Sequence, residues 1–316
     1  MENQYLFPIM DVLKTIGLAI YHWLEAIILF FIPRHLRFKD ISQEVVLITG
    51  AGSGIGRLLA VKLASQVDYL VLWDIVESRL QETGKEVERA GGKCKLYVVD
   101  ISDSKQVYST ADRVKRDVGA VSVIINNAGI VSGKSILELS DEAILKTFEV
   151  NVFSHFWINK AFLPEMMSAN KGHILSMASV ASFVGSDKLT DYSSSKAAAY
   201  MLQESLFLEL KTAGYDGIKI TTVCPYFIDT GMFQGAYDKV IPMLKPDYTA
   251  DKIIEALRTD QYLLILPRLF YFMSAIKTMI PAKSGFYLYS LLGGLEMMKG
   301  FAGRNNNIEN AKVKSN

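Results

Sequence analysis

The chain has 316 residues, 50% of them hydrophobic, and a formal net charge of +1. This length suits one large α/β domain, and the balanced charge gives no support for nucleic-acid binding. The two cysteines, Cys94 and Cys224, lie in or beside predicted core strands, so we expect no disulfide and a reducing compartment. The four histidines are scattered without metal-ligand spacing, and we predict no metal site.

The first predicted element is an apolar helix near the N-terminus. As a helix, the seventeen residues 16–32 reach about 25 Å, slightly less than the ~30 Å of a bilayer hydrocarbon core. A longer helix would take in Asp11 and Lys14, and a charge at the centre of a membrane costs roughly 2.5–3.5 kcal/mol. His22 and Glu25 also interrupt the run, but they are three residues apart, where a helix allows them to pair.

We interpret residues 1–40 as a hydrophobic anchor with a basic linker. No basic segment precedes the apolar run and no small-residue cleavage site follows it, unlike in a cleaved signal peptide. Arg34, His35, Arg37 and Lys39 follow the run, and this bias places the next domain on the cytosolic side. A single span, an anchor inserted in one leaflet, and a helix packed on a soluble domain are all compatible with the segment. A one-leaflet anchor would suit a lipid-droplet surface as well as the endoplasmic reticulum membrane.

A glycine-rich loop follows the next predicted strand. Residues 45–48 are β-branched and apolar, which predicts a buried parallel strand, and residues 57–64 predict a helix. Between them lies Thr-Gly-Ala-Gly-Ser-Gly-Ile-Gly at positions 49–56. A strand, a glycine turn and a helix N-terminus direct backbone N–H groups toward a pyrophosphate. The predicted cofactor-binding residues of this loop are Gly50, Ser53, Gly54, Ile55 and Gly56.

Asp74 closes the second predicted strand, residues 69–73, at the distance from the loop expected of a ribose-binding acid. Its carboxylate can accept hydrogen bonds from both adenosine ribose hydroxyls of NAD and would repel the 2′-phosphate of NADP. Ile75, not a basic residue, follows it. We therefore predict NAD as the cofactor, in preference to NADP.

Strand-like and helical runs alternate through the rest of the chain, which predicts a single doubly wound parallel sheet, a Rossmann domain, over residues 41–266. The further predicted strands are residues 96–99, 121–126, 173–177, 218–223 and 262–266.

Tyr192 and Lys196 lie four residues apart in a predicted helix, residues 191–213, and therefore on the same helix face. As a general base near neutral pH, a tyrosine needs its pKa of ~10 lowered by roughly 3 units, and a nearby ammonium favours the phenolate. Ser179 follows the predicted strand 173–177, where its hydroxyl could hydrogen-bond a substrate oxygen. The alternative is a surface tyrosine and lysine on an amphipathic helix.

These motifs resemble the short-chain dehydrogenase/reductase family over roughly residues 44–266. The resemblance implies that Asp100 and Ile101 border the adenine and that Asn151 organises a water relay beside Lys196. It also implies that Lys196 binds the nicotinamide ribose and that Thr230 contacts the nicotinamide. Positions 126–129, Asn-Asn-Ala-Gly, match the family turn after the fourth strand, with Asn127, Ala128 and Gly129 as cofactor-binding residues.

The wider pattern is similar to the membrane- and lipid-droplet-associated branch that contains epidermal retinol dehydrogenase and the 17β-hydroxysteroid dehydrogenases type 11 and 13. Trp73-Asp74 and the segments 160–164 and 230–233 carry this likeness. Tyr226 departs from the family, which usually has glycine there, so the backbone should avoid positive φ. Tyr226 and Phe227 either form a wall of the substrate pocket or only pack.

The segment between residues 263 and 301 is unusually apolar, but Pro267 and Pro281 exclude one continuous spanning helix. For residues 267–303 we expect short membrane-facing helices near the pocket entrance, with dimer or core packing as the alternative. The polar tail 304–316 is predicted to be disordered. A mobile apolar lid, or ordinary packing, is predicted from Met232, Phe233, Tyr237 and Met243.

The expected activity is hydride transfer from a lipophilic alcohol to NAD, which gives an aldehyde or ketone. The resemblance to the branch suggests retinol as the first substrate and a hydroxysteroid as the second. An NADP-dependent carbonyl reductase and a membrane or droplet scaffold with vestigial activity are the alternatives. We expect a homodimer at the endoplasmic reticulum membrane or the lipid-droplet surface, with the catalytic domain in the cytosol.

Overall fold

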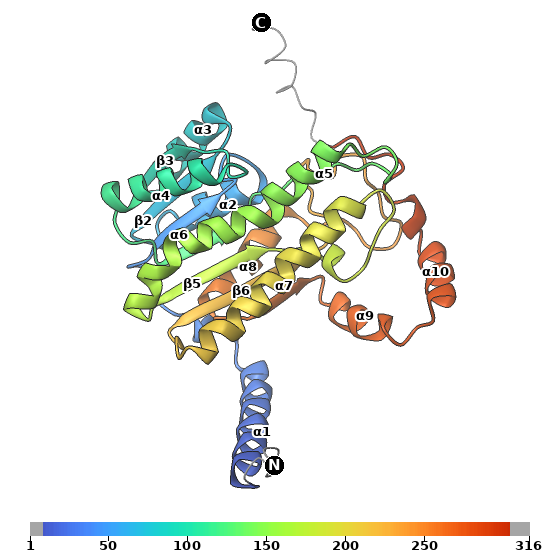
Figure 1. Cartoon of the computed structure of the whole chain (residues 1–316), viewed down its shortest axis with the longest axis horizontal. Coiled ribbons are helices and arrows are strands. Elements are labelled where there is room, and N and C mark those ends of the chain that lie inside the picture. Colours follow the sequence, from blue (N-terminus) through green and yellow to red (C-terminus); the bar gives the residue numbers. More distant parts are fainter. Residues whose placement is uncertain (1–8, 304–316) are drawn as a thin grey trace, which may run out of the picture. The chain divides into compact units, whose positions relative to one another are not determined.

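The computed structural model describes residues 9–303, so the predicted polar tail 304–316 lies outside the described part of the chain. The chain divides into two compact units, with the boundary between Lys39 and Asp40. The first unit contains an apolar helix and the short turn Arg34–Arg37, and the second contains the sheet and the helices that pack on it (Figure 1).

The second unit is built on a seven-stranded sheet in the order β3-β2-β1-β4-β5-β6-β7. Every pair of neighbouring strands is parallel, which confirms the predicted doubly wound α/β fold. The strands are β1 Val45–Thr49, β2 Tyr69–Asp74, β3 Cys94–Val98, β4 Val123–Asn126, β5 Gly172–Met177, β6 Ile218–Pro225 and β7 Leu263–Leu266.

Helices cover both faces of this sheet. The longer ones are α2 Gly54–Leu63, α3 Glu77–Arg89, α4 Ser104–Asp117, α5 Asp141–Phe148, α6 Ser154–Ala169, α7 Thr190–Thr212 and α8 Pro246–Arg258. Short turns are η1 Arg34–Arg37, the π-helical η2 Glu149–Phe153, η3 Val180–Ser182 and η4 Gly294–Glu296. The two hydrophobic cores place α2, α3 and α8 on one face and α4, α6 and α7 on the other.

Side-chain alternation along the strands explains why both faces need a cover. In β1, Val46 and Ile48 belong to the core under α2 and α8, whereas Leu47 belongs to the core under α4 and α6. In β2, Leu72 and Trp73 divide in the same way. Because successive side chains point to opposite faces, a strand that is apolar at every position is buried on both sides.

The C-terminal segment forms two separate helices, α9 Leu269–Lys277 and α10 Ala282–Leu291, with Pro281 as the N-cap of the second. Phe270, Met297 and Met298 are buried within the second unit. None of the residues of α10 is buried. The segment is therefore partly core and partly an exposed apolar surface.

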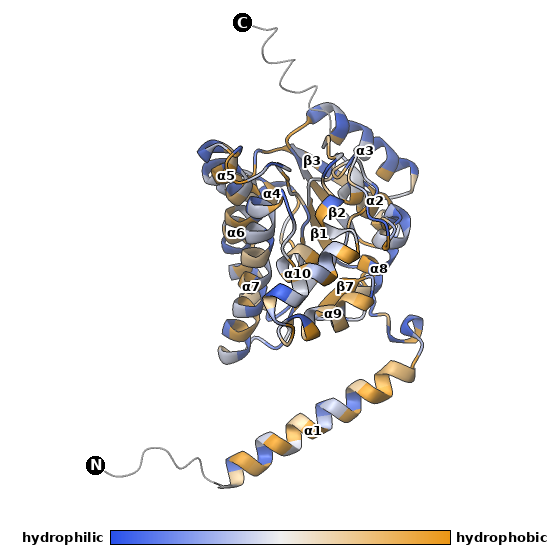
Figure 2. Cartoon of the chain, turned by 90° about the vertical axis from the view of Figure 1, so that its right-hand side faces the viewer, coloured by the Kyte–Doolittle hydropathy of each residue, from blue (hydrophilic) through white to orange (hydrophobic). Residues whose placement is uncertain are grey.

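The first unit contains α1 Ile9–Phe31, which starts earlier than the predicted apolar run. Its residues from Met10 to Phe31 form a helix of 22 residues that is apolar enough to cross a membrane. A helix of this length reaches about 33 Å, which matches a hydrocarbon core of ~30 Å. His22 Nδ1 lies 2.9 Å from Glu25 Oε2, which confirms the predicted pair. Figure 2 shows apolar residues along α1.

Candidate active site

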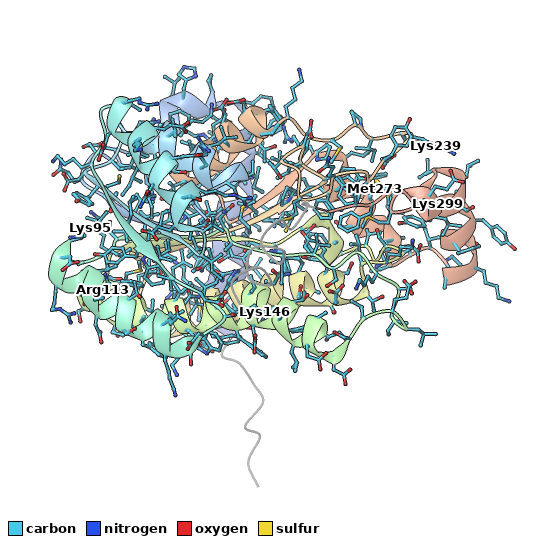
Figure 3. The ribbon with its side chains drawn as sticks, turned by 90° about the horizontal axis from the view of Figure 1, so that it is seen from above. Lys95, Arg113, Lys146, Lys239, Met273 and Lys299 are labelled. Carbon is cyan, nitrogen blue, oxygen red and sulfur yellow. The ribbon has the colours of Figure 1, made fainter. Side chains whose placement is uncertain are left out.

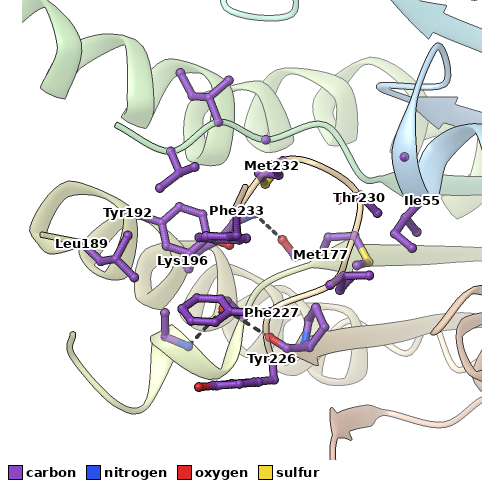
Figure 4. A pocket seen from close by; sticks show the side chains of 18 of the residues that line it. Ile55, Met177, Leu189, Tyr192, Lys196, Tyr226, Phe227, Thr230, Met232 and Phe233 are labelled. Carbon is purple, nitrogen blue, oxygen red and sulfur yellow. Dashed lines mark hydrogen bonds between the residues drawn. The ribbon is translucent and has the colours of Figure 1, made fainter. Parts of the chain in front are cut away.

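A cavity of about 550 Å³ opens at the carboxyl ends of the central strands, where ligands bind in doubly wound sheets. Most of the predicted site residues line it. From the catalytic and nicotinamide side these are Ser179, Tyr192, Lys196 and Thr230, and from the cofactor loops they are Gly50, Ser53, Gly54, Ile55, Asp74, Asp100, Ile101, Asn127, Ala128 and Gly129. Gly56 and Asn151 do not line the cavity. Gly56 packs against Gly50 and Asn127, and Asn151 bonds to Ile130, and these three neighbours do line it. Figure 4 shows part of this cavity.

The glycine loop forms a cradle in which a side chain at the glycine positions would collide with neighbouring atoms. Gly50 has a φ of +66°, which favours glycine. A Cβ on Gly56 would lie 2.2 Å from Gly50 O, and one on Gly52 would lie 2.9 Å from Asp74 Oδ2. The loop leads into the N-terminus of α2, whose first backbone N–H groups are available to an anion. These residues fit the pyrophosphate of a dinucleotide.

Asp74 is held at the end of β2 beside this loop. Its Oδ2 accepts a hydrogen bond from Gly52 N at 2.8 Å and its Oδ1 accepts one from Val76 N at 2.9 Å. Each carboxylate oxygen has a second lone pair, so the group retains capacity to accept from a ribose hydroxyl. Arg79, which the sequence reasoning missed, also lines the cavity. The cofactor subsite therefore has a basic residue as well as the predicted acid.

Hydrogen bonds join the turn after β4 to Thr49, which precedes the glycine loop at the end of β1. Thr49 Oγ1 accepts hydrogen bonds from Asn127 N at 3.0 Å and Ala128 N at 3.1 Å. Asn127 Nδ2 donates to Thr49 O at 2.9 Å. A Cβ on Gly129 would lie within 3.4 Å of Lys196 Nζ. Glycine at this position therefore leaves room for the lysine.

Asp100 is part of an ion pair. Its Oδ2 lies 3.1 Å from Lys146 Nζ, and its Oδ1 accepts hydrogen bonds from the backbone and hydroxyl of Ser102. Burial works to raise the pKa of Asp100, but the bonds from Ser102 and Lys146 outweigh it and lower that pKa. Lys146, on α5, also lines the cavity and was missed. This end of the cleft therefore holds a carboxylate that stays ionised.

Tyr192 and Lys196 come together on one face of α7, as their spacing predicts (Figure 4). Lys196 Nζ lies 5.8 Å from the centroid of the Tyr192 ring and donates to Met177 O at 2.7 Å. Ser179 follows β5, where its Oγ accepts from Ala181 N at 3.1 Å and donates to Pro225 O at 3.3 Å. All three side chains are buried and line the same cavity.

The electrostatics of this group differ from the sequence expectation. Burial raises the pKa of Tyr192 to about 12, although the nearby Ser179 hydroxyl acts in the opposite direction. Burial also lowers the pKa of Lys196 to about 8. Removal of water from the phenolate thus opposes the lowering of the tyrosine pKa by Lys196, and that lowering stays a prediction. A further positive charge beside the phenol would be needed to offset it.

Asn151 lies in the π-helical turn η2, an irregularity that often marks functional sites. Its side chain is buried and bonds to both backbone groups of Ile130, with Nδ2 donating to the carbonyl at 3.0 Å and Oδ1 accepting from the N–H at 2.9 Å. Nδ2 also donates to Ser195 Oγ at 3.0 Å, next to Lys196 in the chain. The asparagine thus links the loop after β4 to α7 beside Lys196.

Aromatic side chains line the cavity next to Tyr192. The Tyr192 and Phe233 rings meet edge to face at 5.6 Å, and the Tyr226 and Phe270 rings stack at 5.1 Å. Tyr226 Oη donates to Asp238 and lies 3.0 Å from Met297 Sδ. Tyr226 does not have positive φ, which confirms the expectation for a residue that replaces glycine. Tyr226 and Phe227 therefore both pack and line the pocket.

The predicted lid is only partly at the cavity. Met232 and Phe233 line it, whereas Tyr237 is exposed and Met243 packs behind it. The sequence reasoning did not identify several residues that complete this end of the cavity. They are Asp238 and Val240 from residues 231–246, which we call the lid segment, and Met273, Tyr289, Leu292, Met297 and Phe301 from residues 267–303, the C-terminal segment. Only tertiary folding brings these segments to the site, so local spacing carried no signal for them.

Among residues 9–303, no group of three or more histidine, cysteine or acidic side chains is arranged to hold a metal ion. The polar lining of the cavity includes the dinucleotide subsite, the Tyr192–Lys196–Ser179 group and Asp238. The remainder of its lining is mostly apolar.

Comparison with known proteins assigns these features to a family. Residues 44–240 match the family model of the short chain dehydrogenases. Human epidermal retinol dehydrogenase 2 is 43% identical over 290 residues, which cover 90% of this chain and 93% of that protein. Rat 17-beta-hydroxysteroid dehydrogenase 13 is 40% identical over 259 residues, covering 82% of this chain and 86% of that protein.

A solved short-chain dehydrogenase/reductase from Burkholderia phymatum, in complex with NAD, superimposes with a TM-score of 0.69. It is 27% identical, and the match covers 76% of this chain and 95% of that one. The sheet order, the glycine cradle and the Tyr192–Lys196 pair agree with these matches, so the chain belongs to the short-chain dehydrogenase/reductase family.

Proposed function

We propose that this protein oxidises a lipophilic alcohol to the aldehyde or ketone with NAD as the hydride acceptor. One observation carries the proposal. Tyr192, Lys196 and Ser179 meet where the dinucleotide cleft joins a pocket lined by aromatic side chains. Proton-transfer groups between a cofactor cradle and an apolar pocket suit an alcohol with a large hydrophobic body.

Each polar residue has a distinct role in this reaction. Oxidised nicotinamide, held by the glycine loop and Lys196, would supply the hydride acceptor and a positive charge. Tyr192 takes the proton from the substrate hydroxyl, and Ser179 orients the substrate oxygen by a hydrogen bond. Lys196, with a pKa of about 8, is mostly protonated at neutral pH and holds the ribose as well as favouring the phenolate. Asn151 supports the water relay beside Lys196, through which the proton taken from the alcohol leaves to solvent.

The apolar lining and the names of the relatives support retinol as the first substrate and a hydroxysteroid as the second. Asp74 beside the glycine loop supports NAD, because its carboxylate would repel a 2′-phosphate. Arg79 in the same subsite supports the alternative, an NADP-dependent carbonyl reductase, since a guanidinium can pair with that phosphate.

Tyr192→Phe tests the reaction directly. We expect the variant to fold and to bind NAD but to lose turnover by about 10²–10⁴-fold, the usual contribution of a general base. NADH fluorescence with retinol, sterols and long-chain alcohols is the measurement, in the membrane fraction and with both cofactors. Retained turnover would refute the role of Tyr192. No signal from the wild type across the whole panel would support a scaffold with vestigial activity.

We also propose that α1 anchors the protein to the endoplasmic reticulum membrane or the lipid-droplet surface, with the catalytic unit in the cytosol. The apolar composition and length of α1 and the basic linker after it support this location.

A homodimer is proposed from the exposed apolar side chains on and next to α6 and α7, namely Phe153, Phe156, Met201 and Leu208. Exposed apolar residues on neighbouring helices are typical of a subunit interface. Light scattering of the purified protein in detergent would measure its mass.

A further inference from the structure

The helices α9 and α10 and the residues that adjoin them carry exposed apolar side chains. Leu291 is 83% exposed, Met279 at the connection between the helices is 81% exposed, and Tyr287 is 73% exposed. We call these residues and their exposed apolar neighbours the α9–α10 surface, comprising Leu269, Phe272, Met279, Phe286, Tyr287, Leu288, Leu291 and Leu292. A contiguous set of this kind marks a binding site for an apolar partner. Figure 2 shows apolar residues on both helices.

Charge identifies the chemistry of that partner. Residues 268–295 contain no aspartate or glutamate, but they include Lys277, whose Nζ donates to the backbone oxygen of Phe183, and Lys283. Lys239 and Lys299 lie in the same part of the molecule (Figure 3) but pair with Glu296 at 2.6 and 3.2 Å. Apolar side chains interspersed with bases and without acids fit the boundary between anionic headgroups and acyl chains.

A second copy of the chain fits this surface less well. An isologous contact would bring two sets of Lys277 and Lys283 together, and residues 268–295 supply no carboxylate. The aromatic residues Phe286 and Tyr287 favour a lipid interface, where tyrosine rings concentrate.

The same helices also form part of the cavity. Phe270 and Met273 of α9 and Tyr289 of α10 line it with their inner faces. Leu292 lines the cavity and is also exposed, as is Val240 of the lid segment. These two residues therefore form an apolar rim between the cavity and the α9–α10 surface. A hydrophobic molecule crossing that rim from a lipid phase would not need to pass through water.

We propose that the α9–α10 surface docks into the headgroup region of a phospholipid layer and that the substrate enters the cavity from that layer over Leu292 and Val240. Docking is independent of any activity, whereas the entry route rests on the proposed oxidation of a lipophilic alcohol. This contact with lipid is separate from the one proposed for α1 and acts at the opening of the cavity.

Docking can be measured without activity. In the full chain with Cys94→Ala, single cysteines at Tyr287 or Leu291 carry a fluorophore, and Leu137, which is 95% exposed and does not line the cavity, is the control. Cys224 is buried and should not react. The protein is placed in phosphatidylcholine vesicles with and without phosphatidylserine. Quenching by nitroxide lipids and by aqueous iodide is then compared.

We expect nitroxide lipids to quench the labels at 287 and 291 several-fold more than the label at 137, and more strongly with phosphatidylserine. Iodide should show the reverse order. Equal iodide quenching at all three positions would overturn docking. Shielding of positions 287 and 291 from both quenchers would also overturn it and indicate a protein partner, including a second copy.

The entry route has its own test. Tyr287→Glu/Leu291→Glu should raise the KM for a long-chain alcohol carried in vesicles about tenfold and leave kcat/KM for a short water-soluble alcohol unchanged. Leu137→Glu is the matched control. An unchanged KM for the vesicle-borne alcohol would refute entry from lipid. Absence of activity with every alcohol would refute the proposed function and leave the quenching result intact.

Discussion

Asp74 is the residue that most directly tests the choice between NAD and NADP. Its carboxylate faces the glycine loop and is held by Gly52 N and Val76 N. Asp74→Asn removes the negative charge and one acceptor, so we expect the KM for NAD to rise about tenfold, equivalent to roughly 1.4 kcal/mol. The KM for NADP should fall, because the repulsion of its phosphate disappears. Steady-state kinetics with both cofactors measure the change.

The variant Arg79→Ala distinguishes NAD from NADP as the natural cofactor. If NAD is the natural cofactor, this variant should retain its KM for NAD, since no role with the ribose hydroxyls is assigned to the guanidinium. A wild-type preference for NADP that disappears in Arg79→Ala would instead assign Arg79 to the 2′-phosphate.

His155 is a buried histidine with no hydrogen-bond partner on either ring nitrogen among the described residues. Burial, assisted by the charge of Lys196, lowers its pKa to about 3. Below pH ~6.5 the unfolded chain therefore takes up a proton that the folded chain does not. We expect this residue to reduce the free energy of unfolding by about 1 kcal/mol between pH 6 and pH 5. Urea unfolding at both pH values measures the loss.

His155→Asn should remove this part of the pH dependence, whatever its effect on stability at pH 7. His35 is exposed, and His35→Asn is the matched control that should leave the slope unchanged. An identical slope in wild type and His155→Asn would show that residue 155 does not remain neutral in the folded protein.

At the scale of residues, the sequence predicts positions that depend on local geometry. Tyr192 and Lys196 share a helix face because they are four apart, and Asp74 reaches the loop because it ends the neighbouring strand. Arg79, Lys146 and the pKa of Tyr192 were not predicted. The two basic residues reach the cavity only through helix placement, and the pKa depends on burial that no spacing reveals.

Among the elements, the lid segment is held to the C-terminal segment by the side chain of Tyr226. Its hydroxyl donates to Asp238, whose other oxygen accepts from Val240 N at 2.7 Å and Ile241 N at 3.0 Å. Tyr226→Phe removes the first bond and keeps the stacking on Phe270. We expect a loss of about 1–2 kcal/mol of stability and a KM for lipophilic substrates several-fold higher. Thermal unfolding and kinetics provide both values.

Tyr248→Phe is the control for this substitution, because Tyr248 is exposed and lies on α8, away from the cavity lining. It should change neither value. If Tyr226→Phe matches it in stability and KM, the hydroxyl does not hold the lid in place.

The strands could be predicted because strong apolar runs are buried on both faces of the sheet, as in β1 and β5. Strand β4 starts two residues later than predicted, at Val123, and the preceding Ser122 bonds to Val45 of the neighbouring β1 through its hydroxyl. The role of α9 and α10 could not be decided from composition. Their apolar residues divide between the cavity lining and an exposed surface, and only the fold assigns each to a side.

For the whole molecule, attachment to a membrane should depend on the middle of α1. Its charged residues Asp11 and Lys14 lie near the start of the helix, where a headgroup region can solvate them, and Glu25 is paired with His22. Replacing Leu18 and Ile20 by arginine would add two central charges at roughly 2.5–3.5 kcal/mol each. We expect the double variant of the full chain to move from the membrane fraction to the soluble fraction. Met10→Arg, at the end of the helix, should not.

The same helix determines which membranes are accessible. A 22-residue helix of about 33 Å can span a bilayer, but a droplet is bounded by a single phospholipid layer that no spanning helix can cross. A fluorescent fusion of residues 1–40 should therefore remain in the endoplasmic reticulum in oleate-loaded cells if α1 spans, and move to droplets if it lies in one leaflet. We expect droplet labelling, because a full span would bury the polar pair His22 and Glu25 in hydrocarbon. Exclusive labelling of the reticulum would contradict a one-leaflet anchor.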